Sequence, residues 1–141
     1  MRAMIMAAGL GTRLLPLTEM SPKPMVPILG APILHHILNL LRRHNITDVV
    51  INLHHVPDAI TGYFGIGEEW NMNIDYSFEP KLMGTAGGVK QNEEFLTKEG
   101  TFLVVSGDSL MDADLSALVE AHRDAGSAAT LALKEVADPS Q

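Results

Sequence analysis

Residues 2–13 read RAMIMAAGLGTR, an apolar run that is followed at once by two closely spaced glycines. A short apolar run bounded by a turn signal is typical of a strand that is buried on both faces, as in a parallel sheet. We therefore predict a strand over residues 2–7. Gly9 and Gly11 let the backbone turn tightly after this strand, so that successive N–H groups can face an anion.

Beyond this stretch, strands and helices alternate along the chain. Further strands are expected at residues 48–53, 73–78, 101–106 and 128–136. Helices are expected at residues 32–44, 85–95 and 114–125, with short helical turns within 57–70. Residues 8–31 contain four prolines, which predict an extended loop because proline interrupts helices. The alternation predicts an α/β fold with a mainly parallel sheet and helices on both faces.

The composition is that of a soluble globular domain, with 141 residues, 46% apolar and 19% charged. Cysteine is absent, which excludes disulfide frameworks, thiolate metal sites and cysteine nucleophiles. No apolar run approaches the roughly 20 residues of a membrane span. The first residues lack the cleavage signal of a secretory peptide. We therefore expect a cytoplasmic protein with no membrane partner.

The net charge of −7 argues against nucleic acid as a partner, because binding to a polyanion needs a basic field. The charge is unevenly distributed. Residues 1–44 carry five basic residues against one acidic residue, whereas the remainder carries −11. Arg42 and Arg43 suit the end of a predicted helix, where they complement its dipole. Arg13 and Lys23 are left as candidate phosphate ligands.

Three later segments carry residues suited to a nucleotide site. Prolines on both sides of Lys23, in SPKPMVP at 21–27, hold this lysine in a defined direction. In EPKLMGTAGG at 79–88, small residues let a base or ribose lie against the backbone. Asp108 ends the segment VVSGD, where a carboxylate could hold Mg²⁺ against phosphate oxygens.

Each segment alone also has an ordinary structural explanation. For the glycine loop it is a simple turn, and for Lys23 it is a solvated lysine. For residues 79–88 it is close helix packing, and for Asp108 it is a turn cap. Gly87 and Gly88 cost roughly 1 kcal/mol each within a helix and so require a packing or ligand reason. Leu14 occupies the third glycine position of GxGxxG, which argues against a dinucleotide site. The two histidine doublets lack the spacing of a metal site.

Taken together, the four segments resemble the sugar-1-phosphate nucleotidyltransferases, also called nucleotide-sugar pyrophosphorylases. AAGLGTRLLPLT, SPKPMVPI, EPKLMGTAGG and VVSGD occur in that family's order and spacing. The likeness is greatest to mannose-1-phosphate guanylyltransferases, with the thymidylyl and uridylyl branches as near alternatives. The resemblance implies a Rossmann-like, doubly wound domain. It also implies nucleotidyl transfer from an NTP to a sugar 1-phosphate, with pyrophosphate leaving.

The resemblance also implies roles for individual residues. Arg13 would stabilise the departing pyrophosphate, Lys23 would bridge the phosphates of the two substrates, and Asp108 would ligate Mg²⁺. The expected nucleotide-binding residues are Ala8, Gly9, Leu10, Gly11, Thr12, Glu79, Gly84 and Thr85. Glu79 falls at a base-reading position. A carboxylate can accept from the N1–H and amino group of guanine, which favours GTP, whereas a glutamine would suit uracil or thymine better.

Members of this family are longer and supply sugar-binding residues and a second metal-binding aspartate beyond residue 141. We therefore expect residues 1–141 to be a nucleotide-binding domain that stops before the sugar-binding part. The alternative is a non-catalytic module that binds a nucleotide or nucleotide-sugar. A homo-oligomer is compatible with the sequence, which does not fix the oligomeric state.

Overall fold

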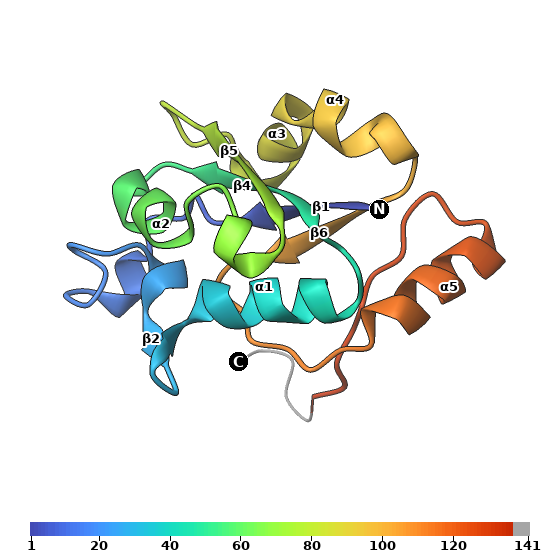
Figure 1. Ribbon diagram of the computed structural model, residues 1–141, viewed down its shortest axis with the longest axis horizontal. Helices are drawn as coiled ribbons and strands as arrows, with labels where there is room; N and C mark the ends of the chain where they lie inside the picture. Colours follow the sequence, from blue (N-terminus) through green and yellow to red (C-terminus); the bar gives the residue numbers. More distant parts are fainter. Residues whose placement is uncertain (137–141) are drawn as a thin grey trace. The chain divides into compact units, whose positions relative to one another are not determined.

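The computed structural model describes residues 1–136, and the chain forms two compact units, Met1–Met111 and a second that begins at Asp112. The first unit is built on a four-stranded parallel sheet, in the order β5-β4-β1-β6 (Figure 1). Its strands are β1 (Arg2–Met6), β4 (Asp48–Leu53), β5 (Asn73–Phe78) and β6 (Phe102–Ser106). The strands predicted for this unit are confirmed to within one residue at each end.

Helices lie on both sides of this sheet. Figure 1 shows α1 (Ile33–Arg43) on one side and α3 (Gly84–Gln91) with α4 (Glu93–Leu96) on the other. Between β4 and β5 the chain forms α2 (Pro57–Phe64) and the 3-10 helix η3 (Glu68–Trp70). The predicted Rossmann-like α/β architecture is confirmed. The single helix expected at 85–95 is divided at Asn92, whose amide donates to the carbonyl of Gly88 (2.9 Å).

The order of the strands identifies the place where a ligand is expected. From β1 the chain adds β4 and then β5 on one side, whereas β6 returns to the other side of β1. The side on which the chain adds new strands to the sheet therefore reverses between β1 and β6. In parallel sheets, ligands bind beyond the carboxyl ends of the strands at such a reversal.

The core of the first unit is apolar on both faces of the sheet. Met4 and Val50 form a buried cluster with Leu96 of α4. On the other side, α1 buries Leu34 and Leu38, which are fully inaccessible to solvent. Each Å² of apolar surface that is buried stabilises the fold by about 25 cal/mol. The buried sheet is therefore a stable support for the loops at its ends.

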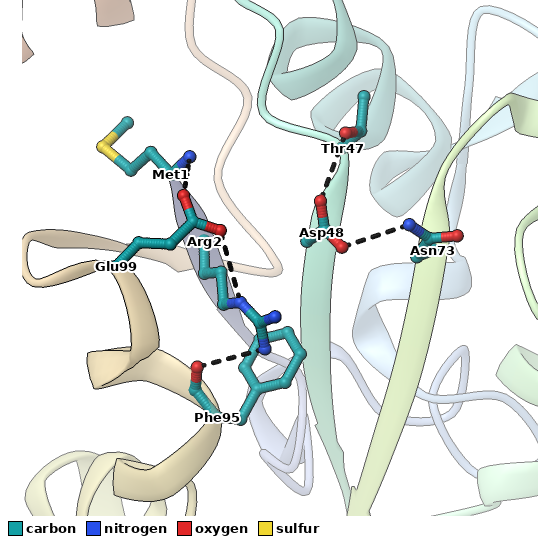
Figure 2. Close-up of polar contacts among 7 residues, drawn as sticks. All are labelled: Met1, Arg2, Thr47, Asp48, Asn73, Phe95 and Glu99. Atoms are coloured by element: carbon teal, nitrogen blue, oxygen red, sulfur yellow. Dashed lines mark hydrogen bonds and ion pairs between the residues drawn. The ribbon is translucent and has the colours of Figure 1, made fainter.

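Polar contacts hold the amino ends of β1 and β4 against neighbouring elements (Figure 2). The guanidinium of Arg2 lies over the ring of Phe95, 4.4 Å from its centroid, and donates to the carbonyl of the same residue (3.3 Å). Its Nε lies 3.6 Å from a carboxylate oxygen of Glu99. Between β4 and β5, the amide of Asn73 donates to Asp48 (3.1 Å). These contacts lie at the end of the sheet opposite the predicted ligand site.

The region predicted as an extended loop, residues 8–31, contains more structure than expected. It holds two 3-10 helices, η1 (Thr12–Leu14) and η2 (Lys23–Met25). Strands β2 (Pro27–Ile28) and β3 (Ala31–Pro32) then form a small antiparallel hairpin. Its turn residues have positive φ angles, 52° at Leu29 and 82° at Gly30. The hairpin was missed because leucine is not one of the residues that signal such a turn.

The second unit contains α5 (Leu115–Ala125), as predicted. The carboxylate of Asp114 accepts from the N–H of Ala117 (3.0 Å), and Gly126 ends the helix at φ 59°. The prediction of a strand at 128–136 is wrong, because these residues form no strand. Leu131 and Leu133 are 78% and 88% exposed. A run of mostly apolar residues favours a strand, but only hydrogen bonds to a neighbour and burial hold one in place.

Within residues 1–136, no helix has the length and apolar character needed to cross a bilayer.

His35 of α1 predicts how stability responds to acid. Its ring stands edge-on to Trp70, with centroids 4.7 Å apart, and its buried Nδ1 has no hydrogen-bond partner among the described residues. Burial, together with the positive charges of His36 and Arg42, lowers the pKa of His35. Because a lowered pKa disfavours protonation of the folded state, stability should fall as the pH drops below the usual histidine value of 6.5.

Urea unfolding above and below this pH measures the effect. His35→Phe keeps a ring against Trp70 and removes the titration, so its midpoint should depend less on pH. An equal loss in the wild type and the variant would contradict the prediction.

Candidate functional site

A cavity of about 600 Å³ lies beyond the carboxyl ends of β1, β4, β5 and β6 in the first unit. All eleven residues that the sequence predicts for the site line it: Ala8, Gly9, Leu10, Gly11, Thr12, Arg13, Lys23, Glu79, Gly84, Thr85 and Asp108. They come from segments far apart in the chain and meet at the reversal of the sheet. The structure thus brings the predicted residues together, while their individual roles stay predictions.

The loop after β1 forms one wall and is held from behind by Thr18. Gly11 has φ 64°, and a Cβ at this position would lie 2.9 Å from the Cγ2 atom of Thr18. The Thr18 hydroxyl donates to the carbonyl of Gly11 (2.8 Å), and Thr18 is only 1% exposed. The ring Nε2 of His55 lies 2.8 Å from the carbonyl oxygen of Thr18. The glycine loop is therefore fixed before any ligand arrives.

Arg13 follows this loop within η1 and lines the cavity with an exposed side chain. A guanidinium is always charged and offers a planar fork of donors, which matches phosphate oxygens. Its position beside the glycine loop suits the phosphate role that the sequence predicts.

Lys23 and Asp108 form an ion pair inside the cavity. The Nζ atom of Lys23 lies 2.6 Å from Oδ2 of Asp108, and the hydroxyls of Ser106 and Ser109 donate to Oδ1 at 2.6 and 3.3 Å. Partial burial raises the pKa of Asp108, but the hydrogen bonds from Lys23 and the two serines outweigh it and lower the pKa overall. The carboxylate is therefore ionised at neutral pH.

Glu79 lies in the cavity wall but is already hydrogen-bonded. It is 1% exposed, with Oε1 accepting from the amide of Asn52 (2.8 Å) and Oε2 accepting from the N–H of Met83 (3.0 Å). Each carboxylate oxygen has a second lone pair for a further donor. The base-reading role of Glu79 stays a prediction.

The glycines of α3 have a packing explanation. A Cβ on Gly88 would lie 2.9 Å from Oε1 of Glu79 and 3.1 Å from the amide nitrogen of Asn52. A Cβ on Gly87 would lie 2.8 Å from that of Met83. At both positions only hydrogen fits. Gly88 lets α3 approach Glu79 and Asn52 of the cavity wall closely, and Gly87 leaves room for Met83 at the start of the helix.

A divalent metal was predicted at Asp108. Among residues 1–136, no group of three or more histidine, aspartate or glutamate side chains could hold a metal ion. Asp108 does present a hard, ionised oxygen donor to the cavity. Mg²⁺ is commonly bound by one or two carboxylates together with phosphate oxygens and water. The residues present therefore suit an ion that is held jointly with a nucleotide.

Sequence reasoning missed several lining residues. They are Met6, Ala7, Leu14, Pro24, Asn52, Leu82 and Ser106. Asn52 could have been recognised, because it is a polar residue within the otherwise apolar end of a predicted buried strand, VVINL.

Residues 2–141 match the family described as nucleotidyl transferase. Among curated relatives, a UTP–glucose-1-phosphate uridylyltransferase of Synechocystis is 42% identical over 96% of this chain. A mannose-1-phosphate guanylyltransferase of Mycobacterium tuberculosis is 36% identical over 97% of it. In each case this chain spans only 38% of the relative's length.

Solved structures agree in fold. A Bacillus anthracis structure, assigned as a glucose-1-phosphate thymidylyltransferase, superposes with a TM-score of 0.81 at 26% identity, covering 87% of this chain and 50% of that one. HddC from Yersinia pseudotuberculosis, complexed with GMP-PN, has a TM-score of 0.77 at 28% identity, covering 87% and 54%. With the family match over residues 2–141, the chain belongs to the nucleotidyl transferase family.

Proposed function

We propose that this chain is the nucleotide-binding part of an enzyme that transfers a nucleotidyl group from an NTP to a sugar 1-phosphate. One observation carries the proposal: a glycine loop, Arg13, Lys23 and Asp108 converge on a single cavity at the reversal of the sheet. Backbone donors, two cations and a carboxylate are the groups that phosphate chemistry requires. The sugar pocket would be supplied by sequence that these residues do not include.

In this reaction an oxygen of the sugar 1-phosphate attacks the α-phosphorus of the NTP, and pyrophosphate leaves as the bond to the β-phosphate breaks. The protein's contribution is positioning and charge neutralisation. The backbone of residues 9–12 would cradle the phosphates, and Arg13 would stabilise the charge that develops on pyrophosphate. Lys23 would bridge the attacking phosphate and the α-phosphate. To do so, its ammonium would leave the ion pair with Asp108 and bind substrate oxygens instead.

Asp108 would hold Mg²⁺, an ion that neutralises phosphate charge when bound. The carboxylate is available for this because hydrogen bonds keep it ionised.

For the substrates we favour GTP and mannose 1-phosphate. Glu79 offers only acceptors, which suit the two donors of guanine. The relative from M. tuberculosis and the GMP-PN complex of HddC agree with this choice. The uridylyltransferase at 42% identity supports the alternative, a uridylyl or thymidylyl transfer to another sugar 1-phosphate.

A substrate panel tests the function. Each of GTP, UTP and dTTP is combined with mannose or glucose 1-phosphate and Mg²⁺, and released pyrophosphate is measured for this chain and for any longer parent protein. We expect the highest rate with GTP and mannose 1-phosphate. A best rate with UTP or dTTP would select the alternative branch. Nucleotide binding by calorimetry without turnover in either protein would indicate a binding module instead.

A further inference from the structure

One buried amide joins the two walls of the cavity. Asn52, near the carboxyl end of β4, is 1% exposed and lines the cavity. Its Oδ1 accepts from the backbone N–H of Ala7 at 2.6 Å, and its Nδ2 donates to Oε1 of Glu79 at 2.8 Å. Ala7 directly precedes the glycine loop, and Glu79 directly follows β5. The amide therefore sets the separation between the phosphate wall and the wall that carries Glu79.

The orientation of this amide is fixed by its partners. The backbone N–H of Ala7 can only donate, so it requires an acceptor from Asn52. The Asn52 oxygen must therefore face Ala7, and its nitrogen must face Glu79. A buried polar group left without its partner is destabilising, so both contacts constrain the residue at this position.

The end of β4 is built to hold this arrangement. The ring Nδ1 of His54 lies 2.7 Å from the carbonyl oxygen of Glu79. Val56 adopts φ 44° and ψ 57°, a left-handed conformation that is rare for a β-branched residue. Strain of this kind persists only where the surrounding structure imposes it. The end of β4 thus contacts the Glu79 segment through both His54 and Asn52.

We infer that Asn52 is a positioning residue for base selection, acting through Glu79; this rests on the proposed function. Oε2 of Glu79 is committed to the N–H of Met83, and Oε1 to the donor of Asn52. A glutamine at 79 would have to turn its NH₂ group against one of these two donors. The hydrogen-bonding character that residue 79 shows a base can therefore change only together with residue 52.

An exchange of the two polar groups tests this. In Asn52→Asp with Glu79→Gln, the carboxylate at 52 still accepts from Ala7, and the amide at 79 can donate to it while its oxygen accepts from Met83. Wild type, N52D, E79Q and the double variant of the full chain are compared by urea unfolding. Binding of GTP and UTP with Mg²⁺ is measured on all four by calorimetry.

We expect each single variant to raise the unfolding equilibrium constant at least about tenfold, because a buried pair is mismatched. The affinity for both nucleotides should fall by a similar factor. The double variant should recover the unfolding constant to within about threefold of wild type, as coupled neighbours do. Its GTP-to-UTP affinity ratio should fall at least about tenfold, because a glutamine offers uracil a donor and an acceptor.

Asn92→Ala is the matched control. Asn92 is also a buried amide, bonded to Ser77 and Gly88, but it does not line the cavity. The Asn92→Ala variant should be less stable than wild type, but its ratio of GTP to UTP affinity should not change.

The outcomes separate the two ideas. If the changes in the free energy of unfolding of the two single variants simply add in the double variant, the coupling between Asn52 and Glu79 is overturned. Recovered stability with an unchanged nucleotide ratio would overturn the role in base selection. A wild-type chain that binds neither nucleotide would refute the proposed function and its base selection together, and the unfolding cycle would still decide whether Asn52 and Glu79 act as a unit.

Discussion

Replacing Asp108 with asparagine is expected to lower kcat/KM for pyrophosphate release at least about 100-fold, in whichever form of the protein is active. The change keeps the size of the side chain but removes the charge that pairs with Lys23 and that would hold Mg²⁺. The measurement is the rate with GTP and mannose 1-phosphate over a series of Mg²⁺ concentrations.

Asp75→Asn is the matched control for this change. Asp75 lies exposed on β5, away from the cavity lining, and its substitution removes the same charge. Its variant should keep the wild-type rate. A loss of less than about tenfold in the Asp108 variant would exclude the metal role.

The same carboxylate predicts a dependence on pH. Because its pKa is lowered in the folded protein, its contribution to stability is present above the ordinary aspartate value of 3.8 and is lost as the pH falls through the folded pKa. Acid unfolding of Asp108→Asn should therefore depend less on pH in this range than that of wild type.

Replacing Gly11 with alanine is expected to destabilise the fold by about 3 kcal/mol and to weaken NTP binding at least about tenfold. The backbone at Gly11 has φ 64°, and the added Cβ would lie 2.9 Å and 3.1 Å from two atoms of the buried Thr18. Either Thr18 must shift, which breaks its bond to the carbonyl of Gly11, or the loop must open. Urea unfolding and calorimetry with GTP measure the two effects.

Gly30→Ala separates the backbone contribution from the steric one. Gly30 also has a positive φ, 82°, but an added Cβ would meet no atom within 4 Å. Its cost should be about 1 kcal/mol, and NTP binding should not change. Equal destabilisation by both substitutions would show that contact with Thr18 adds nothing.

The strands and the cavity lining could be predicted because both depend on local sequence. Apolar runs such as residues 48–53 have few alternatives to a buried strand, and the residues after parallel strands must gather at one edge of the sheet. The arrangement of Gly9 and Asp108 around one cavity follows from this topology. Lys23 lies in the long loop after β1, and its place at the site was predicted from its flanking prolines and from the resemblance to the family.

Contacts between distant residues could not be predicted in this way. The pairing of Lys23 with Asp108 and the bridge from Asn52 to Glu79 depend on side-chain directions that spacing does not specify. The strand expected at 128–136 was wrong for a related reason, because the apolar character of a segment does not show whether a neighbouring strand pairs with it. At the division of the predicted helix, the amide of Asn92 donates to Ser77 of another element as well as to Gly88, and spacing does not specify such a contact either.

Strand β1 is anchored at both of its ends. Arg2 is held by Phe95 and Glu99 at the amino end (Figure 2), and the N–H of Ala7 is held by Asn52 just beyond the carboxyl end. With β4 and β6 bonded along its edges, the strand acts mechanically as a strut about 17 Å long. A slip by one residue would detach both anchors at once. The glycine loop thus follows a strand that is held at both ends and along both edges, and this strand supports the wall that a phosphate would meet on entering the cavity.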